Sequence, residues 1–372
     1  MRGGLQKAAR VLRLCHNTHL ILQVNALDSG HSVRTDMHQN PQYDHLLCVK
    51  AQAQPNIALI KYWGKHDPAT NTPAVGSLSI TLDSLRTETC IWLNPDLPHD
   101  EFILNGKNDL TGLPRVSRCL DSLRRVAGTS CKAHIESKNN FPTAAGLASS
   151  ASGFAALVIA ATKALGIQTT PAKCADWARQ GSGSAARSIY GGFVEMSLQK
   201  RGGDIEVITK PLLTPEAWHL EVVVAVTSTD AKPVSSSEGM ERTRLTSPYY
   251  SRWIETQDED LQDARKAVNE KDFEKLGNIS EQSCLKMHGL ALAAHPGLIY
   301  WNAATIECLH AIRNMNARGY PVFFTVDAGP QVKAICEPEV TGEVVGTLES
   351  VSGVQSTIVS RLGQGAQLVK PS

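Results

Sequence analysis

The sequence has few aromatic residues, no excess of charge of one sign and no long run of large apolar side chains. Its 372 residues carry a formal net charge of +1, and aromatic residues make up 5%. A charge near zero provides no general field for nucleic acid, a membrane surface or an acidic protein. The only stretch of membrane-spanning length, residues 144–165, is rich in alanine, serine and glycine, which favours a buried helix. We therefore expect no nucleic-acid and no membrane partner.

The nine cysteines lack the spacing of a metal site. No two of them form a CxxC pair, and no histidine falls at zinc-ligand spacing from such a pair. An odd and dispersed set of cysteines is typical of a reducing compartment, where most serve as small buried apolar residues. The sequence therefore predicts no protein-held metal and favours a cytoplasmic location.

The first fifty residues lack carboxylates until Asp28, although Arg2, Lys7, Arg10 and Arg13 precede it. A basic, acid-poor start resembles an organellar transit peptide. A disordered extension, or a start assigned upstream of Met37, explains the same composition and is favoured here. The apolar stretch at residues 20–24 is too short for the core of a secretory signal. We expect residues 1–50 to form a poorly ordered extension.

Strand-like and helix-like patterns follow each other without strict alternation, which predicts an α+β fold. A soft boundary near residues 211–217 divides the remainder into residues 51–215 and 216–372. Thr170 and Pro171 mark a helix start, because they suit the N-cap and first helical positions. The expected strands are 57–62, 79–82, 89–93, 221–227, 321–326 and 357–360, and the expected helices are 147–165, 171–180, 258–270 and 298–318.

The segment PTAAGLASSAS, residues 142–152, has the features of a loop that binds nucleotide phosphates. Small side chains let backbone N–H groups approach a polyphosphate, and the following helix directs its positive N-terminal end at the anion. The serines add hydroxyls for phosphate oxygens or Mg²⁺. An alanine- and serine-rich buried helix is the structural alternative. The residues expected at ATP are Pro142, Ala145, Gly146, Leu147, Ser149, Ser150 and Ser152.

Two other nucleotide motifs are excluded. The sequence contains no G-x-x-x-x-G-K-[ST], so it has no Walker-type loop. Gly181, Gly183 and Ala186 do spell G-x-G-x-x-A, but the preceding segment is helix-like, whereas a Rossmann fingerprint follows a strand.

Two further clusters carry cationic and hydroxyl side chains. In the first, Lys61 and Lys65 flank an aromatic segment that begins with Tyr62, and such ammonium groups suit a diphosphate. A surface strand with solvated lysines is the alternative, and it is favoured when this cluster is considered alone. In the second, Ser182 and Ser184 alternate with glycines before Arg187, whose guanidinium suits a carboxylate. A flexible connector with a solvated arginine explains this second pattern equally well.

Asp327 follows an apolar strand and opens an Ala-Gly-Pro turn. A carboxylate at the end of a buried strand is well placed to abstract a proton or to position a hydroxyl. An aspartate that only caps its own turn is a common alternative, and it is favoured when this segment is considered alone.

Taken together, these clusters resemble the GHMP kinase superfamily and, within it, the mevalonate diphosphate decarboxylases. The resemblance runs from about residue 55 to 335 through IALIKYWGKHD, GSLSITL, NNFPTAAGLASSASG, RQGSGSAARSIYGGF, VSSSEGM and TVDAGP. It implies a ribosomal-S5-like N-terminal domain, a ferredoxin-like C-terminal domain and an active-site cleft between them. It also implies ATP and Mg²⁺, and a reaction that converts mevalonate 5-diphosphate to isopentenyl diphosphate with release of ADP, phosphate and CO₂.

The resemblance also assigns roles to residues. Asp327 matches the aspartate that acts on or orients the substrate 3-hydroxyl, and Arg187 matches the arginine that anchors the substrate carboxylate and contacts that aspartate. Lys61 matches a lysine near the aspartate and the transferring phosphoryl. Tyr62, Lys65, Ser182 and Ser184 match the diphosphate site, and Ser149, Ser150, Ser77 and Ser236 match hydroxyls on the ATP side. Glu238 departs from relatives that carry a basic residue in its stretch, which puts one phosphate contact in question.

Related activities on the same scaffold remain open alternatives. A phosphomevalonate decarboxylase would lack a diphosphate site, and Tyr62 and Lys65 favour the diphosphate. A mevalonate 3-kinase, which stops at phosphorylation, can dispense with the set Lys61, Arg187 and Asp327. A catalytically silent binding protein would have lost Asp327 or the loop serines. The resemblance further implies a homodimer, although no interface can be read from the sequence.

Overall fold

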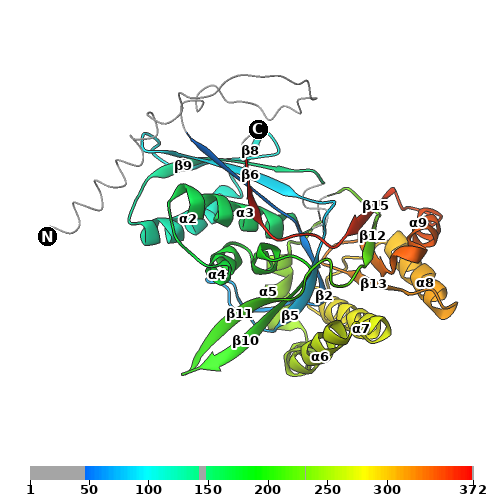
Figure 1. Ribbon diagram of the computed structural model, residues 1–372. Helices are drawn as coiled ribbons and strands as arrows, with labels where there is room; N and C mark the ends of the chain where they lie inside the picture. The colour runs from blue at the N-terminus through cyan, green and yellow to red at the C-terminus, as the bar shows by residue number, and fades with distance from the viewer. Residues whose placement is uncertain (1–46, 142–147, 231, 371–372) are drawn as a thin grey trace, which may run out of the picture.

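A computed structural model describes residues 47–141, 148–230 and 232–370, and the statements below concern these residues. Its strands form a six-stranded sheet, two four-stranded sheets and one two-stranded ribbon. Helices α2 and α3 lie along one side of the six-stranded sheet with α4 beyond them, and α6, α7, α8 and α9 gather around the other end of the molecule (Figure 1). This mixture of sheets and helices confirms the predicted α+β class.

The six-stranded sheet has the order β16-β1-β6-β9-β7-β8, and β7 and β9 are its parallel pair. Its strands are β1 (Cys48–Ala53), β6 (Thr87–Asn94), β7 (Glu101–Leu104), β8 (Lys107–Asn108), β9 (Lys132–Asn139) and β16 (Gln367–Val369). Strand β16 comes from the far end of the chain and pairs antiparallel with β1. The first strand of the described chain and the last are therefore neighbours in one sheet.

Helix α3 (Ser149–Ala164) covers this sheet and contacts β1 and β6. Its buried face is built largely from alanines such as Ala155, Ala156 and Ala160, all fully buried. These small side chains let the helix approach both the sheet and its neighbours α2 (Leu113–Ala127) and α4 (Pro171–Gly181) closely. The alanine-rich composition noted in the sequence is thus explained by close packing.

The second sheet, β11-β10-β5-β2, is antiparallel throughout. It comprises β2 (Asn56–Ile60), β5 (Ser77–Thr81), β10 (Phe193–Arg201) and β11 (Asp204–Leu213), with the ribbon β3 (Lys65–Asp67) and β4 (Thr72–Pro73) beside it and the short helix η3 (Ala185–Ile189) before β10. Every residue of β2 and β5 is buried. Each fully buried leucine or isoleucine here contributes about 1.5–3 kcal/mol of transfer free energy, so these two strands form a rigid base.

The third sheet, β13-β14-β12-β15, is also antiparallel. Along the chain, its elements are β12 (Glu221–Val226), a set of helices, β13 (Val322–Val326), β14 (Val332–Cys336), helix α9 (Thr341–Glu349) and β15 (Ser356–Arg361). This β-α-β-β-α-β succession is the ferredoxin-like motif that the family resemblance implies. The remaining helices are α5 (Ser236–Thr246), α6 (Tyr250–Glu270), α7 (Phe273–Leu292), α8 (Ala303–Ala317) and η4 (Pro338–Val340).

Helix α7 joins the second and third sheets, since it contacts both β2 and β13. The side chain of Ser283 on α7 accepts a hydrogen bond of 3.0 Å from the backbone N–H of Lys61. Cys284, the next residue, accepts one of 3.2 Å from the backbone N–H of Val326. The ends of β2 and β13 are therefore held against the same turn of one helix, and this brings together two chain segments that lie far apart in sequence.

All six expected strands are present, but two expected helix starts are wrong. The helix expected from residue 298 begins at Ala303, because Asn302 forms a capping box with Thr305 that fixes the start there. The helix expected from residue 258 begins earlier, at Tyr250, since Trp253 and Gln257 continue its buried face toward the N-terminus. The expected start at Leu147 lies outside the described residues. Within the described ranges, no helix is long and apolar enough to cross a membrane.

The predicted N-cap at Thr170 is confirmed, because its side chain accepts a hydrogen bond from the backbone N–H of Lys173 at the start of α4. We expect Thr170→Ala to lower the free energy of unfolding by about 1 kcal/mol, the usual cost of losing an N-cap hydroxyl. Urea unfolding followed by circular dichroism measures this loss. Thr169→Ala, at the neighbouring exposed threonine outside the cap, is the control and should lower the midpoint less.

Candidate active site

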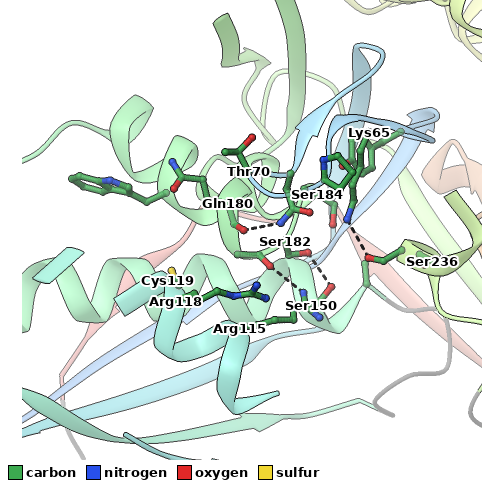
Figure 2. A pocket seen from close by; sticks show the side chains of 18 of the residues that line it. Lys65, Thr70, Arg115, Arg118, Cys119, Ser150, Gln180, Ser182, Ser184 and Ser236 are labelled. Atoms are coloured by element: carbon green, nitrogen blue, oxygen red, sulfur yellow. Dashed lines mark hydrogen bonds between the residues drawn. The ribbon is translucent and has the colours of Figure 1, made fainter. Parts of the chain in front are cut away.

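A cavity of about 1130 Å³ opens where the end of β2, the start of α3, helix η3 and the β13–β14 turn meet. Lys61, Tyr62, Ser150, Arg187 and Asp327 all line it, although they come from four separate stretches of sequence. Figure 2 shows how Lys65, Arg115, Ser150, Ser182 and Ser184 lie around one part of this cavity. The phosphate-site motifs and the turn aspartate predicted from sequence therefore share one cleft, which is called the cleft below.

Lys61 and Asp327 form the central ion pair of the cleft. The Lys61 ammonium lies 2.7 Å from Asp327 Oδ1 and donates a second hydrogen bond of 2.9 Å to the Ala58 carbonyl. Lys61 is 1% exposed, so the alternative of a solvated surface lysine is wrong for this residue. Asp327 faces the cleft with 24% of its side chain exposed and is an ion-pair partner, which also excludes the alternative of an aspartate that only caps its own turn.

A second lysine, Lys333, approaches the other carboxylate oxygen. Its ammonium lies 3.4 Å from Asp327 Oδ2, and its side chain is 1% exposed. Burial alone would raise the pKa of Asp327, but the opposing charges of Lys61 and Lys333 lower it well below its usual range. Asp327 is therefore ionised at neutral pH. Sequence reasoning missed Lys333, although a lone charge within the apolar strand VKAIC was a usable signal.

Arg187 is buried deep in the wall of the cleft and does not contact Asp327 as the resemblance implied. Its Nε donates to Ser79 Oγ at 3.0 Å and to Asn56 Oδ1 at 3.3 Å, and its Nη1 donates to Ser77 Oγ. The guanidinium also lies 5.9 Å from the centroid of the Tyr62 ring. Burial lowers the pKa of Arg187 to about 10, so the group is still cationic at neutral pH. Lys333 is thus the second cation at Asp327, and Arg187 is fixed nearby by hydroxyl and amide partners.

Tyr62 directs a hydroxyl into a buried position where it has no hydrogen-bond partner among the described residues. Burial raises the pKa of Tyr62 to about 12, so the phenol is neutral and able to donate. Gly183 lies directly against it, because a Cβ added there would come within 2.1 Å of the Tyr62 hydroxyl oxygen. An unpartnered buried hydroxyl in the cleft wall is suited to a ligand oxygen.

Polar side chains from three other segments complete this side of the cleft. Ser150 on α3 and Ser182 at the end of α4 are hydrogen-bonded at 3.1 Å (Figure 2). Ser184 precedes η3, and its carbonyl accepts a hydrogen bond of 3.0 Å from Asn56 Nδ2. Lys65 donates to Ser237 Oγ at 3.3 Å, and partial burial together with the nearby Arg115 lowers its pKa. Ser149 also lines the cleft.

Lys232 is a further cation of the cleft that the sequence analysis did not select. Its ammonium donates to Ser236 Oγ at 2.7 Å and to the Ala328 carbonyl at 3.0 Å, which links the start of α5 to the turn that follows Asp327. Glu238, the residue that raised doubt about a phosphate contact, does not line the cleft. It is exposed and forms an ion pair of 2.7 Å with Arg242 on the same helix.

Several predicted ATP-side residues lie elsewhere. Ser77 and Ser152 are fully buried and do not line the cleft. The Ser77 hydroxyl bonds Arg187, and that of Ser152 lies 2.6 Å from Thr87 Oγ1. In this structure both hydroxyls therefore support other groups. Pro142, Ala145, Gly146 and Leu147 lie outside the described residues. Arginines of α2, among them Arg115 and Arg118, line the cleft and were not predicted.

We expect Gly183→Ala to lower kcat/KM roughly 10–100-fold, because the added methyl group must displace the Tyr62 ring and small misplacements in a site are costly. Gly289→Ala in α7 is the control, since a Cβ there meets nothing within 4 Å. Steady-state kinetics of both variants test this, with circular dichroism as a check on folding. Equal kinetics of the two variants would show that the contact between Gly183 and Tyr62 is unimportant.

The residues of the cleft fit a nucleotide and a second phosphate-bearing ligand. Its volume is ample, and ammonium groups, hydroxyls and the start of α3 are all suited to anions. No group of three or more histidine, cysteine, aspartate or glutamate side chains among the described residues is arranged to hold a metal ion. Mg²⁺ that accompanies a nucleotide is usually bound by one or two carboxylates together with substrate phosphates and water.

Comparison with known proteins agrees with this geometry. Residues 53–206 match the diphosphomevalonate decarboxylase-like N-terminal domain, and residues 222–369 match the mevalonate 5-diphosphate decarboxylase C-terminal domain. The diphosphomevalonate decarboxylase of Candida albicans is 37% identical over 295 residues, which cover 75% of this chain and 81% of that protein.

Solved structures extend the agreement to three dimensions. The mevalonate diphosphate decarboxylase of Staphylococcus aureus has a TM-score of 0.81 and 38% identity, covering 87% of this chain and 98% of that one. A complex described as MDDEF with MVAPP, AMPPCP and magnesium has a TM-score of 0.80 and 37% identity, covering 88% of this chain and all of that one. Fold, sequence and cleft agree: the chain belongs to the diphosphomevalonate decarboxylase family.

Proposed function

We propose that this chain catalyses the ATP-dependent decarboxylation of mevalonate 5-diphosphate to isopentenyl diphosphate, with release of ADP, phosphate and CO₂. The observation that carries the proposal is the ion pair between the buried Lys61 and the partly exposed Asp327, at the wall of a cleft that has cations and hydroxyls on its other sides. The similar MDDEF structure contains MVAPP, AMPPCP and magnesium, which supports the same ligand classes for this cleft.

Asp327 is assigned to the tertiary 3-hydroxyl of the substrate. A tertiary alcohol is a poor nucleophile, so an ionised carboxylate that accepts its hydrogen bond orients the oxygen toward the γ-phosphoryl group of ATP. Lys61 touches the same carboxylate and is placed to stabilise negative charge that develops during transfer. Mg²⁺ bound with ATP supplies further neutralisation of the phosphoryl charge.

Arg187 is assigned to the substrate carboxylate. Its hydrogen bonds to Ser77, Ser79 and Asn56 use Nε and Nη1, and Nη2 forms no hydrogen bond with another described residue. Once the 3-phosphate leaves, the electrons of the bond to the carboxylate carbon form the double bond and CO₂ departs. A fixed guanidinium keeps that carboxylate aligned while the bond breaks. Ser77 thereby acts through Arg187 in this proposal, and not at ATP.

The two phosphate-bearing ends are assigned to adjoining parts of the cleft, which meet at the hydrogen bond between Ser150 and Ser182. Tyr62, Lys65, Ser182 and Ser184 are proposed to bind the diphosphate of the substrate, where remote binding energy orients the reacting carbon. The ATP phosphates are proposed to bind at Ser149, Ser150 and Ser236, together with the loop at residues 142–147. Ser152 supports the start of α3 through Thr87 in this proposal.

The proposal is tested with purified protein, ATP, Mg²⁺ and mevalonate 5-diphosphate labelled at the carboxylate. ADP and labelled CO₂ are followed together, and we expect them in equal amounts. ADP without CO₂ would leave only a 3-kinase. Mevalonate 5-phosphate in place of the diphosphate distinguishes the monophosphate decarboxylase, which would turn it over faster. Absence of ADP with every substrate would contradict any catalytic function.

We further propose a homodimer in the cytoplasm, with residues 51–215 and 216–372 as its two domains and residues 1–50 as an extension. The dispersed cysteines suit a reducing compartment, which supports the cytoplasm. Light scattering after gel filtration tests the dimer, since a monomer would elute with half the expected mass. A fluorescent fusion to the full chain tests the location, and organellar fluorescence would support a transit function for residues 1–50.

A further inference from the structure

The carboxylate of Asp327 is held from two sides by two different lysines. Lys61 occupies Oδ1 at 2.7 Å, and Lys333 lies 3.4 Å from Oδ2. Lys61 and Lys333 are both 1% exposed, but Lys61 lines the cleft together with Asp327 and Lys333 does not. A ligand in the cleft can thus meet Lys61 directly but can meet Lys333 only through Asp327.

The position of Lys333 follows from strand register. The pairs Val326–Val332 and Thr325–Lys333 close the β13–β14 hairpin, and the turn between them starts at Asp327. The hydroxyl of Thr325 donates to the Ala58 carbonyl at 3.3 Å, the same carbonyl that accepts from Lys61. Side chains at 325 and 333 therefore emerge toward the end of β2, and a rigid hairpin fixes the distance from Lys333 to the carboxylate.

A fully buried lysine is costly unless an anion compensates it. The charged and titratable groups around Asp327 are Lys61, Lys333, Lys232, Arg187, His288 and Cys284. His288 is neutral, because burial and the charge of Lys61 lower its pKa to about 3, and burial raises the pKa of Cys284. Asp327 is the anion among these groups, so it compensates the charge of Lys333, and Lys333 in turn restrains where the carboxylate can move.

We propose that Lys333 is a positioning residue for the reaction, which acts through Asp327 by fixing the orientation of its carboxylate and keeping it ionised. The inference rests on the proposed function. It adds Lys333, which does not line the cleft, to the residues that act in the reaction. It also gives the two lysines different roles, because Lys61 faces the ligands and Lys333 holds the carboxylate from the opposite side.

The first test compares Lys333→Met with Lys50→Met across pH 5–9. Lys50 is the matched control, because it is also a buried lysine and forms an ion pair of 2.8 Å with Glu88 away from the cleft. Without Lys333 the pKa of Asp327 rises, so protonation inactivates the enzyme at a higher pH than in the wild type. We expect kcat/KM of Lys333→Met to fall roughly 10–100-fold at neutral pH, because even a small misplacement of a reacting group can cost up to about 10²-fold, and to fall further toward acid. A profile parallel to that of Lys50→Met would overturn the proposal.

The second test is a double-variant cycle with Asp327→Asn. If Lys333 acts through Asp327, adding Lys333→Met to Asp327→Asn should change residual turnover less than about twofold, because the effects of residues that act as a unit are not additive. If the fold-losses of turnover of the two single variants multiply in the double variant, the proposal is overturned. Lys333→Arg retains the cation and should keep the wild-type pH profile, even at reduced kcat.

The third measurement does not depend on turnover. Urea midpoints of the wild type, both single variants and the double variant should show coupling, with the double variant losing less than the sum of the single losses. If the wild type releases no CO₂, the proposed function fails, while this cycle still decides whether Lys333 and Asp327 act together. If the midpoint loss of the double variant equals the sum of the two single losses, the pairing of Lys333 with Asp327 is refuted.

Discussion

Asp327→Asn is expected to lower the turnover rate roughly 10²–10⁴-fold, which is the usual contribution of a group that acts on a reacting proton. The amide keeps the shape of the carboxylate but loses its charge, so it neither compensates Lys61 and Lys333 nor accepts strongly from the substrate hydroxyl. Nucleotide affinity should change little, since the serines assigned to the ATP phosphates do not bond Asp327. Single-turnover release of ADP and calorimetric titration with a non-hydrolysable ATP analogue measure the two effects.

The same substitution leaves two buried ammonium groups without their anion, so the melting temperature should also fall. The activity assays are therefore run at a temperature well below the melting temperature of the variant. Asp260→Asn is the matched control, because Asp260 forms an ion pair with Lys286 outside the cleft. It should lower stability somewhat and leave kcat unchanged. Turnover near the wild-type value in Asp327→Asn would refute the assigned role of this carboxylate.

Arg187→Lys is expected to lower kcat/KM about 10²–10³-fold, comparable with the loss of one preorganised hydrogen-bond donor in an active site. Lysine retains the charge but has a single ammonium group. It cannot hydrogen-bond Ser77, Ser79 and Asn56 and also bind a ligand, as the planar guanidinium of Arg187 can. Because the assigned partner is the substrate carboxylate, KM for mevalonate 5-diphosphate should rise, and KM for ATP should stay near its wild-type value.

Arg179→Lys provides the comparison. Arg179 is 6% exposed, donates to Asp176 at 2.7 Å and does not line the cleft. Its substitution should affect stability and not the ratio of the two KM values. Product analysis adds a second criterion for Arg187→Lys: accumulation of ADP in excess of CO₂ would place the arginine in the decarboxylation step, whereas equal loss of both places it in binding or phosphorylation.

Local patterns in the sequence were enough to predict most of the elements around the cleft. The apolar runs before Lys61 and Asp327 predicted β2 and β13, and the Thr170–Pro171 pair predicted the start of α4. Boundaries failed where a cap or a buried face overrode the local pattern, as at Asn302 and Tyr250. The return of β16 to β1 carried no local signal at all, since pairing across the whole chain is a tertiary property.

The site was less predictable, because its central contacts join distant segments. Lys61 and Asp327 are 266 positions apart, and only the family resemblance connected them. Motif membership also did not distinguish a hydroxyl that lines the cleft from one that supports it, as Ser77 and Ser152 show. Lys333 was missed because a strand position reveals the face of the sheet only once the register of its hairpin is known.

The pairing of β16 with β1 has a consequence for cutting the chain. Of the two halves that match separate domain families, the second contributes a strand to the first, since residues 367–369 extend a sheet of the first half. A fragment that ends near residue 215 would leave the backbone groups of β1 unpaired along one edge, and an open edge of this kind recruits other strands. The C-terminal strand therefore covers an edge of the first half, which would have to be protected in another way if the first half were expressed alone.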